Sequence, residues 1–193
     1  MLYQKEFYSS SGSYSYLVAS RDAEGAILID PTPDLMDTYA AHLRRVGREQ
    51  VFTLETGSVR ASRKASSLIA CSWEGRTVVP CDLVEDAQLI RVGHGDSIQL
   101  GGITFDVLGR LGRPNDAVSY RFADRIFIGG RRACEEPEFL GLPPETMIYR
   151  SYSARGENRQ VLATSLEFPS LEASDFESTM GRSDFSPLTP SPV

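Results

Sequence analysis

The chain has 193 residues, of which 41% are hydrophobic and 24% are charged, and its formal net charge at pH 7 is −6. This composition is typical of one globular domain plus a tail, and no apolar run is long enough to span a membrane. The negative charge argues against general binding to nucleic acids. The 3 cysteines form no paired motif, and no basic-then-apolar leader pattern is present, which together predict a reduced, cytoplasmic protein.

Strand patterns dominate the chain and are interrupted by helical patterns. Asp34 stands where it would cap a first helix that runs to Arg45, and Gly47 stands where it would end that helix. A second helix is expected over 63–70 and a third over 157–167. The expected strands cover 2–8, 13–19, 26–29, 51–54, 77–79, 89–92, 97–100, 103–108, 118–122, 126–128 and 146–149. Strand-rich blocks separated by helices predict a layered α/β protein.

The composition changes after Pro169. Residues 170–193 are rich in Ser, Pro, Asp and Glu and poor in aliphatic side chains, which is typical of a disordered or extended tail. We therefore divide the chain into a domain over residues 1–169 and a tail over residues 170–193. The tail repeats an acidic-aromatic triplet at 174–176 and 183–185, which either docks a protein partner or is a chance repetition in a solvated tail.

Seven short segments follow one another along the chain in a characteristic order. They are AILIDP (26–31), VFTLET (51–56), HGDSIQLGG (94–102), VSY (118–120), IFIG (126–129), LPPETMIY (142–149) and FP (168–169). Their order and spacing resemble the metallo-β-lactamase-fold superfamily, in its persulfide dioxygenase and glyoxalase II branch. The resemblance implies an αββα sandwich whose loops would gather at one mouth.

The resemblance also implies where metal ligands would stand, and this chain departs from the pattern there. The degenerate ligand positions are Gly57, Val59, Ala61, Ser62, Arg113, Gly130 and Tyr152. Such sites need neutral imidazoles and carboxylates to hold an ion. We therefore expect no metal, no other cofactor and none of the family's hydrolase or dioxygenase chemistry. The remaining histidines, His42 and His94, are interpreted as structural.

Arginines surround these degenerate positions. The candidate ligand-binding residues are Arg60, Arg63, Arg110, Arg113, Arg131, Arg132, Arg150 and Tyr152. Guanidinium groups in place of metal ligands predict a cleft for an anionic small molecule or an acidic peptide. The alternative is that these arginines are dispersed over the surface or pair locally with Glu55, Asp116 and Glu157.

The leading hypothesis is therefore a non-catalytic member of the fold, a pseudoenzyme that acts as a binding, scaffolding or regulatory subunit. A protein partner would be reached through the 170–193 tail, and a homodimer is a further option. One alternative is a metal-independent thiol- or sulfur-handling enzyme that uses Cys134, whose basic neighbours would favour the thiolate. Another is a metallohydrolase or dioxygenase of the persulfide dioxygenase or glyoxalase II type with unrecognised ligands.

Overall fold

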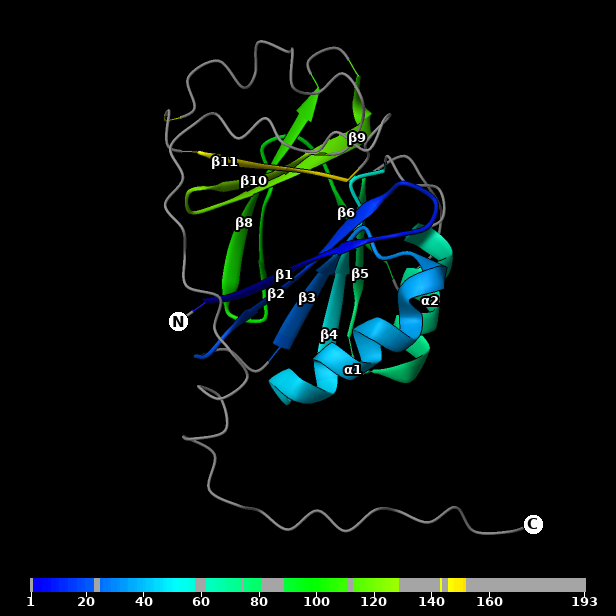
Figure 1. Cartoon of the computed structure of the whole chain (residues 1–193). Helices are drawn as coiled ribbons and strands as arrows, with labels where there is room; N and C mark the ends of the chain where they lie inside the picture. The colour runs from blue at the N-terminus through cyan, green and yellow to red at the C-terminus, as the bar shows by residue number, and fades with distance from the viewer. Residues whose placement is uncertain are drawn as a thin grey trace, which may run out of the picture.

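Two stacked β-sheets, with helices against the outer face of the first, make up the part of the chain that the structure describes (Figure 1). This structure is a computed structural model. It describes residues 2–22, 25–57, 62–73, 75–80, 89–110, 113–128, 143 and 146–151, without the side chains of residues 62, 110 and 113–116. The predicted helix over 157–167 and the 170–193 tail lie outside the described residues.

The first sheet has the strand order β1-β2-β3-β4-β5-β6. Its strands are β1 (Leu2–Tyr8), β2 (Tyr14–Ser20), β3 (Gly25–Ile29), β4 (Gln50–Leu54), β5 (Thr77–Pro80) and β6 (Leu89–Val92). The pairs from β1 to β3 are antiparallel, and the pairs from β3 to β6 are parallel. The parallel strands β3 and β4 therefore end side by side. In the family that the sequence resembles, the first metal-binding loop would follow the end of β4.

The second sheet has the order β11-β10-β9-β8-β7. Its strands are β7 (Ser97–Leu100), β8 (Ile103–Arg110), β9 (Arg113–Phe122), β10 (Arg125–Ile128) and β11 (Met147–Arg150). Neighbours are antiparallel except β10 and β11, which run parallel. The turn between β7 and β8 uses Gly101 and Gly102 at positive φ, a backbone region that glycine adopts without steric cost. The hairpin predicted around these glycines is confirmed.

Helix α1 (Met36–Val46) buries Tyr39, Leu43 and Val46 and ends at Gly47, whose φ of 60 is left-handed. The predicted stop at Gly47 is confirmed, but the predicted cap at Asp34 is wrong. A short 3₁₀ turn, η1 (Pro33–Leu35), precedes α1, and Leu35 occupies the cap position without a side-chain hydrogen bond. The Asp34 carboxylate instead accepts the backbone N–H of Ser10 at 2.9 Å and its hydroxyl at 2.8 Å. Helix α2 (Ser62–Ser72) also covers the first sheet.

Strand alternation sends side chains into two apolar layers. Within β3, Ile27 and Ile29 face the second sheet and meet Phe105 and Tyr120 there. The intervening Leu28 faces the helices and packs with Leu43 of α1 and Ile69 of α2. A strand that is buried on both faces reads as a continuous apolar run, as β3 does. The predicted α/β sandwich is confirmed. Within the described part of the chain, no helix combines the length and apolarity needed to cross a membrane.

Candidate functional site

Three strand ends meet at one end of the sandwich, which we call the mouth. Asp30 follows β3, Glu55 and Thr56 follow β4, and Ser151 follows β11. The two sheets are tied together here, because the Tyr120 hydroxyl donates to the Glu55 carbonyl at 2.9 Å. The Val118 N–H donates to the Thr56 carbonyl at 2.9 Å. Backbone and side chains therefore hold the mouth in one arrangement.

Asp30 is the central polar residue of the mouth, and it is fully buried. Its carboxylate accepts the Thr56 N–H at 2.9 Å and the Thr56 hydroxyl at 2.6 Å. The Ser151 hydroxyl lies beside it, although outside strict hydrogen-bond geometry. Burial raises the pKa of Asp30, hydrogen bonds from Ser151 and Thr56 lower it, and the nearby charge of Glu55 raises it. The net result is a pKa of about 6. Asp30 also has a φ of 46, a conformation that Asp tolerates better than most residues.

Glu55 is the second buried carboxylate among the described residues, with 3% of its surface exposed. Arg63, in the first turn of α2, donates from its Nε to both Glu55 oxygens at 3.0 Å. Burial raises the pKa of Glu55, and the Arg63 guanidinium beside it offsets part of that rise. The pair is therefore a buried carboxylate neutralised by an arginine that remains partly exposed.

The structure describes only some of the residues of the predicted arginine cluster. Arg63 pairs with Glu55, so the alternative of local pairing is confirmed for this residue. Arg110 and Arg113 are opposite one another where β8 and β9 join. Arg150 ends β11, and its carbonyl accepts the Tyr16 hydroxyl at 2.6 Å. Outside the described residues lie Arg60, Arg131, Arg132 and Tyr152, together with Cys134, the alternative nucleophile.

Both histidines have structural contacts. The Tyr3 hydroxyl lies 3.3 Å from Nδ1 of His42, and the His42 ring packs edge-on against Phe7. Nδ1 of His94 accepts the Gly109 N–H at 3.1 Å, which braces the β7–β8 hairpin against its neighbouring loop. These contacts agree with the structural role predicted for both residues.

The described residues of the mouth do not fit a metal ion. No group of at least three His, Cys, Asp or Glu side chains is arranged to hold an ion in the described part of the chain. Asp30 and Glu55 are engaged by Thr56 and Arg63, and Gly57 offers no side-chain donor. A guanidinium in direct contact with one carboxylate also opposes a divalent cation. Among the other degenerate positions, Val59, Ala61, Gly130 and Tyr152 lie outside the described residues, as do the side chains of Ser62 and Arg113.

Sequence reasoning missed the polar network of Asp30, Thr56 and Ser151. The available signal was Asp30 itself, a carboxylate directly after an apolar strand and directly before a proline. A charged residue at that boundary is ordinarily a solvated turn residue, and its burial depends on β11, which arrives about 120 residues later in the chain. The network is a tertiary feature that no local pattern contains.

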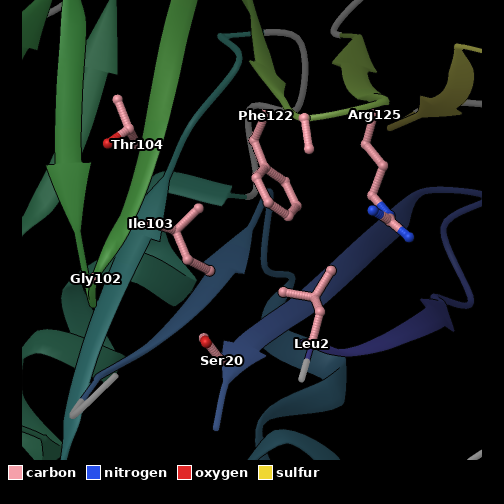
Figure 2. A pocket seen from close by; sticks show the side chains of 8 residues that line it. Leu2, Ser20, Gly102, Ile103, Thr104, Phe122 and Arg125 are labelled. Atoms are coloured by element: carbon pink, nitrogen blue, oxygen red, sulfur yellow. The ribbon is translucent and has the colours of Figure 1, made fainter. Parts of the chain in front are cut away.

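A hollow of about 440 Å³ lies at the end of the sandwich opposite the mouth (Figure 2). Its apolar wall includes Leu2, Ile103 and Phe122, and Arg125 lies at its rim. The Arg125 guanidinium stands over the Phe122 ring at 5.7 Å and donates to Asp124 at 2.6 Å. None of the predicted site residues lines this hollow.

The paired sheets, their strand order and the helical cover define the metallo-β-lactamase fold. ETHE1 from Myxococcus xanthus has a TM-score of 0.69 and 22% identity over 80% of this chain and 77% of that chain. A metallo-beta-lactamase from Staphylococcus aureus subsp. aureus COL has a TM-score of 0.64 and 18% identity, over 80% of this chain and 56% of that chain. The BLEG-1 B3 metallo-beta-lactamase has a TM-score of 0.60 and 15% identity, over 79% of this chain and 92% of that chain. No protein-family model and no curated protein matches the sequence. These likenesses confirm the predicted resemblance at the level of the fold.

Proposed function

We propose that this chain is a metal-independent binding protein built on the metallo-β-lactamase fold, and that its mouth recognises an anionic ligand. Two of the similar structures are named metallo-β-lactamases, so the fold is shared with metal-dependent proteins. The ligand would be an anionic small molecule or an acidic peptide segment, and the role would be that of a binding or regulatory subunit.

The Glu55–Arg63 pair is the observation that carries this proposal. Glu55 engages the Nε of Arg63 with both oxygens, and the side chain of Arg63 keeps 29% of its surface exposed. The two Nη groups of an arginine fork carry further donors that suit a carboxylate, phosphate or sulfate. Glu55 therefore orients a guanidinium at the mouth, and the Nη groups of this guanidinium are the donors that we propose for the anion.

The β8–β9 junction supports the same ligand chemistry. Its backbone register pairs Arg110 with Arg113, two of the arginines that the sequence predicts to bind an anion. Guanidinium groups are strong donors to carboxylate and phosphate groups. This junction adjoins the mouth, since β9 is tied to the end of β4 through Val118 and Thr56.

The test is sulfate binding, measured by isothermal titration calorimetry at low ionic strength on the full chain. Arg113→Ala is expected to weaken binding by about tenfold, the size of one lost charge-assisted hydrogen bond. Arg44→Ala is the matched control, because Arg44 is an exposed arginine in the last turn of α1, away from the mouth.

Two results would overturn the proposal. One is the absence of saturable sulfate binding, or equal binding by Arg113→Ala and the unmodified chain. The other is a stoichiometric content of zinc, iron or manganese in protein purified after growth with those metals, because it would restore the metal-dependent alternative.

A further inference from the structure

Asp30 joins three segments that are far apart in the sequence. It follows β3, binds Thr56 at the end of β4 through two hydrogen bonds, and lies beside Ser151 at the end of β11. The last of these segments is the edge strand of the opposite sheet. Asp30 is also fully buried, so its charge is not solvated by bulk water. A change in its protonation therefore acts on all three segments at once.

We infer that Asp30 is a proton-operated latch at the mouth: protonation locks the ends of β3, β4 and β11 together, and ionisation loosens them. In the ionised form the carboxylate can only accept, and Thr56 supplies both recorded donors. In the protonated form the carboxyl also donates. The Ser151 hydroxyl is buried beside it, and its hydrogen bonding to the ionised carboxylate lowers the pKa of Asp30; in the protonated form the same hydroxyl can accept instead. The Ser151 contact between the sheets is therefore available in both forms, and the difference between them is that only the ionised form leaves a charge buried away from water.

The charged and titratable surroundings of Asp30 support this direction. Burial is the main cause that raises the pKa of Asp30, and like-charge repulsion from Glu55, at the end of β4, adds to it. The net pKa is about 6. Tyr120 on β9 and Tyr16 on β2 stay neutral in this range, because burial and the neighbouring acids raise the pKa of both phenols above the ordinary value. Arg63, on α2, stays charged throughout and contacts Glu55. The pKa of Asp30 therefore lies in the mildly acidic range, and burial raises the pKa of its neighbour Glu55 as well.

The latch has a consequence for ligand binding, and that part rests on the proposed function. Protonation of Asp30 removes one negative charge from the mouth, so an anion at the mouth should bind more tightly at lower pH. Linkage is reciprocal, so a bound anion should in turn raise the pKa of Asp30.

Hydrogen exchange tests the latch without any ligand. Protection factors, which remove the intrinsic pH dependence of exchange, are compared at pH 5 and pH 7.5 for the Thr56 and Ser151 amides. Protection of both is expected to fall by about tenfold or more at pH 7.5, because a shift of two pKa units limits the effect to roughly a hundredfold. The Gly47 amide, which donates within the α1 terminus, is the internal control and should not change.

Two variants make this result specific to Asp30. Asp30→Asn mimics the neutral carboxyl and tolerates the left-handed backbone, so its protection should be the same at both pH values. Ser151→Ala keeps the titrating carboxyl but removes a hydrogen bond that lowers the pKa of Asp30, so the pH-dependent difference should persist and its midpoint should move to higher pH. It also serves if the Asn variant fails to fold. Equal protection of the unmodified chain at both pH values, or unchanged pH dependence in both variants, would overturn the latch.

Sulfate binding at the same two pH values tests the coupling, because sulfate keeps its charge over this range. The unmodified chain should bind several-fold more tightly at pH 5, within the usual size of coupling between sites, and Asp30→Asn should bind equally at both. If sulfate binds at neither pH, the proposed function is wrong, and the hydrogen-exchange measurement alone decides whether the latch exists. Sulfate that binds equally at both pH values in the unmodified chain would disprove the coupling.

Discussion

At the scale of single residues, the mouth depends on how two buried carboxylates are neutralised. Asp30 relies on neutral donors, and Glu55 relies on the Arg63 guanidinium. A neutral arrangement lets the pKa of Asp30 rise, whereas a guanidinium holds a charge in place at every ordinary pH. The two neighbouring acids are therefore neutralised differently, Asp30 by neutral donors and Glu55 by the positive charge of Arg63, which we call the anchor, although burial raises the pKa of both.

The anchor can be tested by substitution. Arg63→Ala leaves Glu55 buried and ionised without its partner, so the free energy of unfolding should fall by about 1.5–3 kcal/mol. Urea denaturation at pH 7 measures this change. In a Glu55→Gln background the same substitution should cost clearly less, since no buried charge is left unpaired. Equal costs in the two backgrounds would show that Arg63 acts through packing alone.

One local pairing that the sequence offered as an alternative is present, and its partners are close in the chain. Glu55 and Arg63 are eight positions apart, across one loop, and were predicted as the alternative to an open arginine cluster. Thr56 and Asp30 are 26 positions apart, and their contact depends on the parallel pairing of β3 with β4. The cluster itself stays a prediction for Arg131 and Arg132, which lie outside the described residues.

At the scale of elements, the strands were predictable because apolar runs and turn residues mark them directly. The observed β3, β4, β7 and β8 differ from the expected ranges by no more than two residues at either end. The start of α1 was not predictable in the same way. Asp34 has the right identity for a cap, but Ser10 in a loop 24 positions earlier takes its carboxylate. A tertiary contact therefore overrode a local preference, which is how capping rules commonly fail.

The end of α1 gives the prediction at this scale. Gly47→Ala places a β-carbon on a residue with φ of 60, and the left-handed conformation costs a non-glycine residue about 1–2 kcal/mol. Thermal unfolding should show a corresponding loss of stability. Gly93→Ala is the matched control, because a β-carbon there meets nothing within 4 Å and the backbone is not left-handed. A Gly93→Ala loss as large as that of Gly47→Ala would refute the conformational explanation.

At the scale of the whole molecule, hydrogen bonds between the two sheets join segments that are far apart in the sequence. β11 reaches the mouth through Ser151, whose N–H donates to Ile128 and whose carbonyl accepts the Tyr14 N–H at 2.9 Å. The sheet order and the two-layer core follow from strand alternation, so the sequence could predict the fold. It could not predict that an acid would be sealed at the junction, because burial at that point is a property of both sheets together.

That sealed acid should govern how the stability of the whole chain depends on pH. The pKa of Asp30 is raised in the folded state, to about 6 from an ordinary value of 3.8, so the folded state binds the proton more tightly. The resulting stabilisation is complete below pH 3.8 and is lost as the pH rises through 6. The stability of the unmodified chain relative to Asp30→Asn should therefore fall by about 2 kcal/mol between pH 4 and pH 7.

The comparison with Asp30→Asn is needed because other acids act in the opposite direction. Hydrogen bonds from Ser10 and Thr32 lower the pKa of Asp34, so that group supports the fold above its unfolded pKa and loses this contribution as the pH falls. Its effect is common to both proteins and cancels in the difference between them. Chemical denaturation at pH 4, 5, 6 and 7 measures that difference. A difference that is flat, or that rises with pH, would mean that Asp30 is solvated in the folded protein and that the mouth is open.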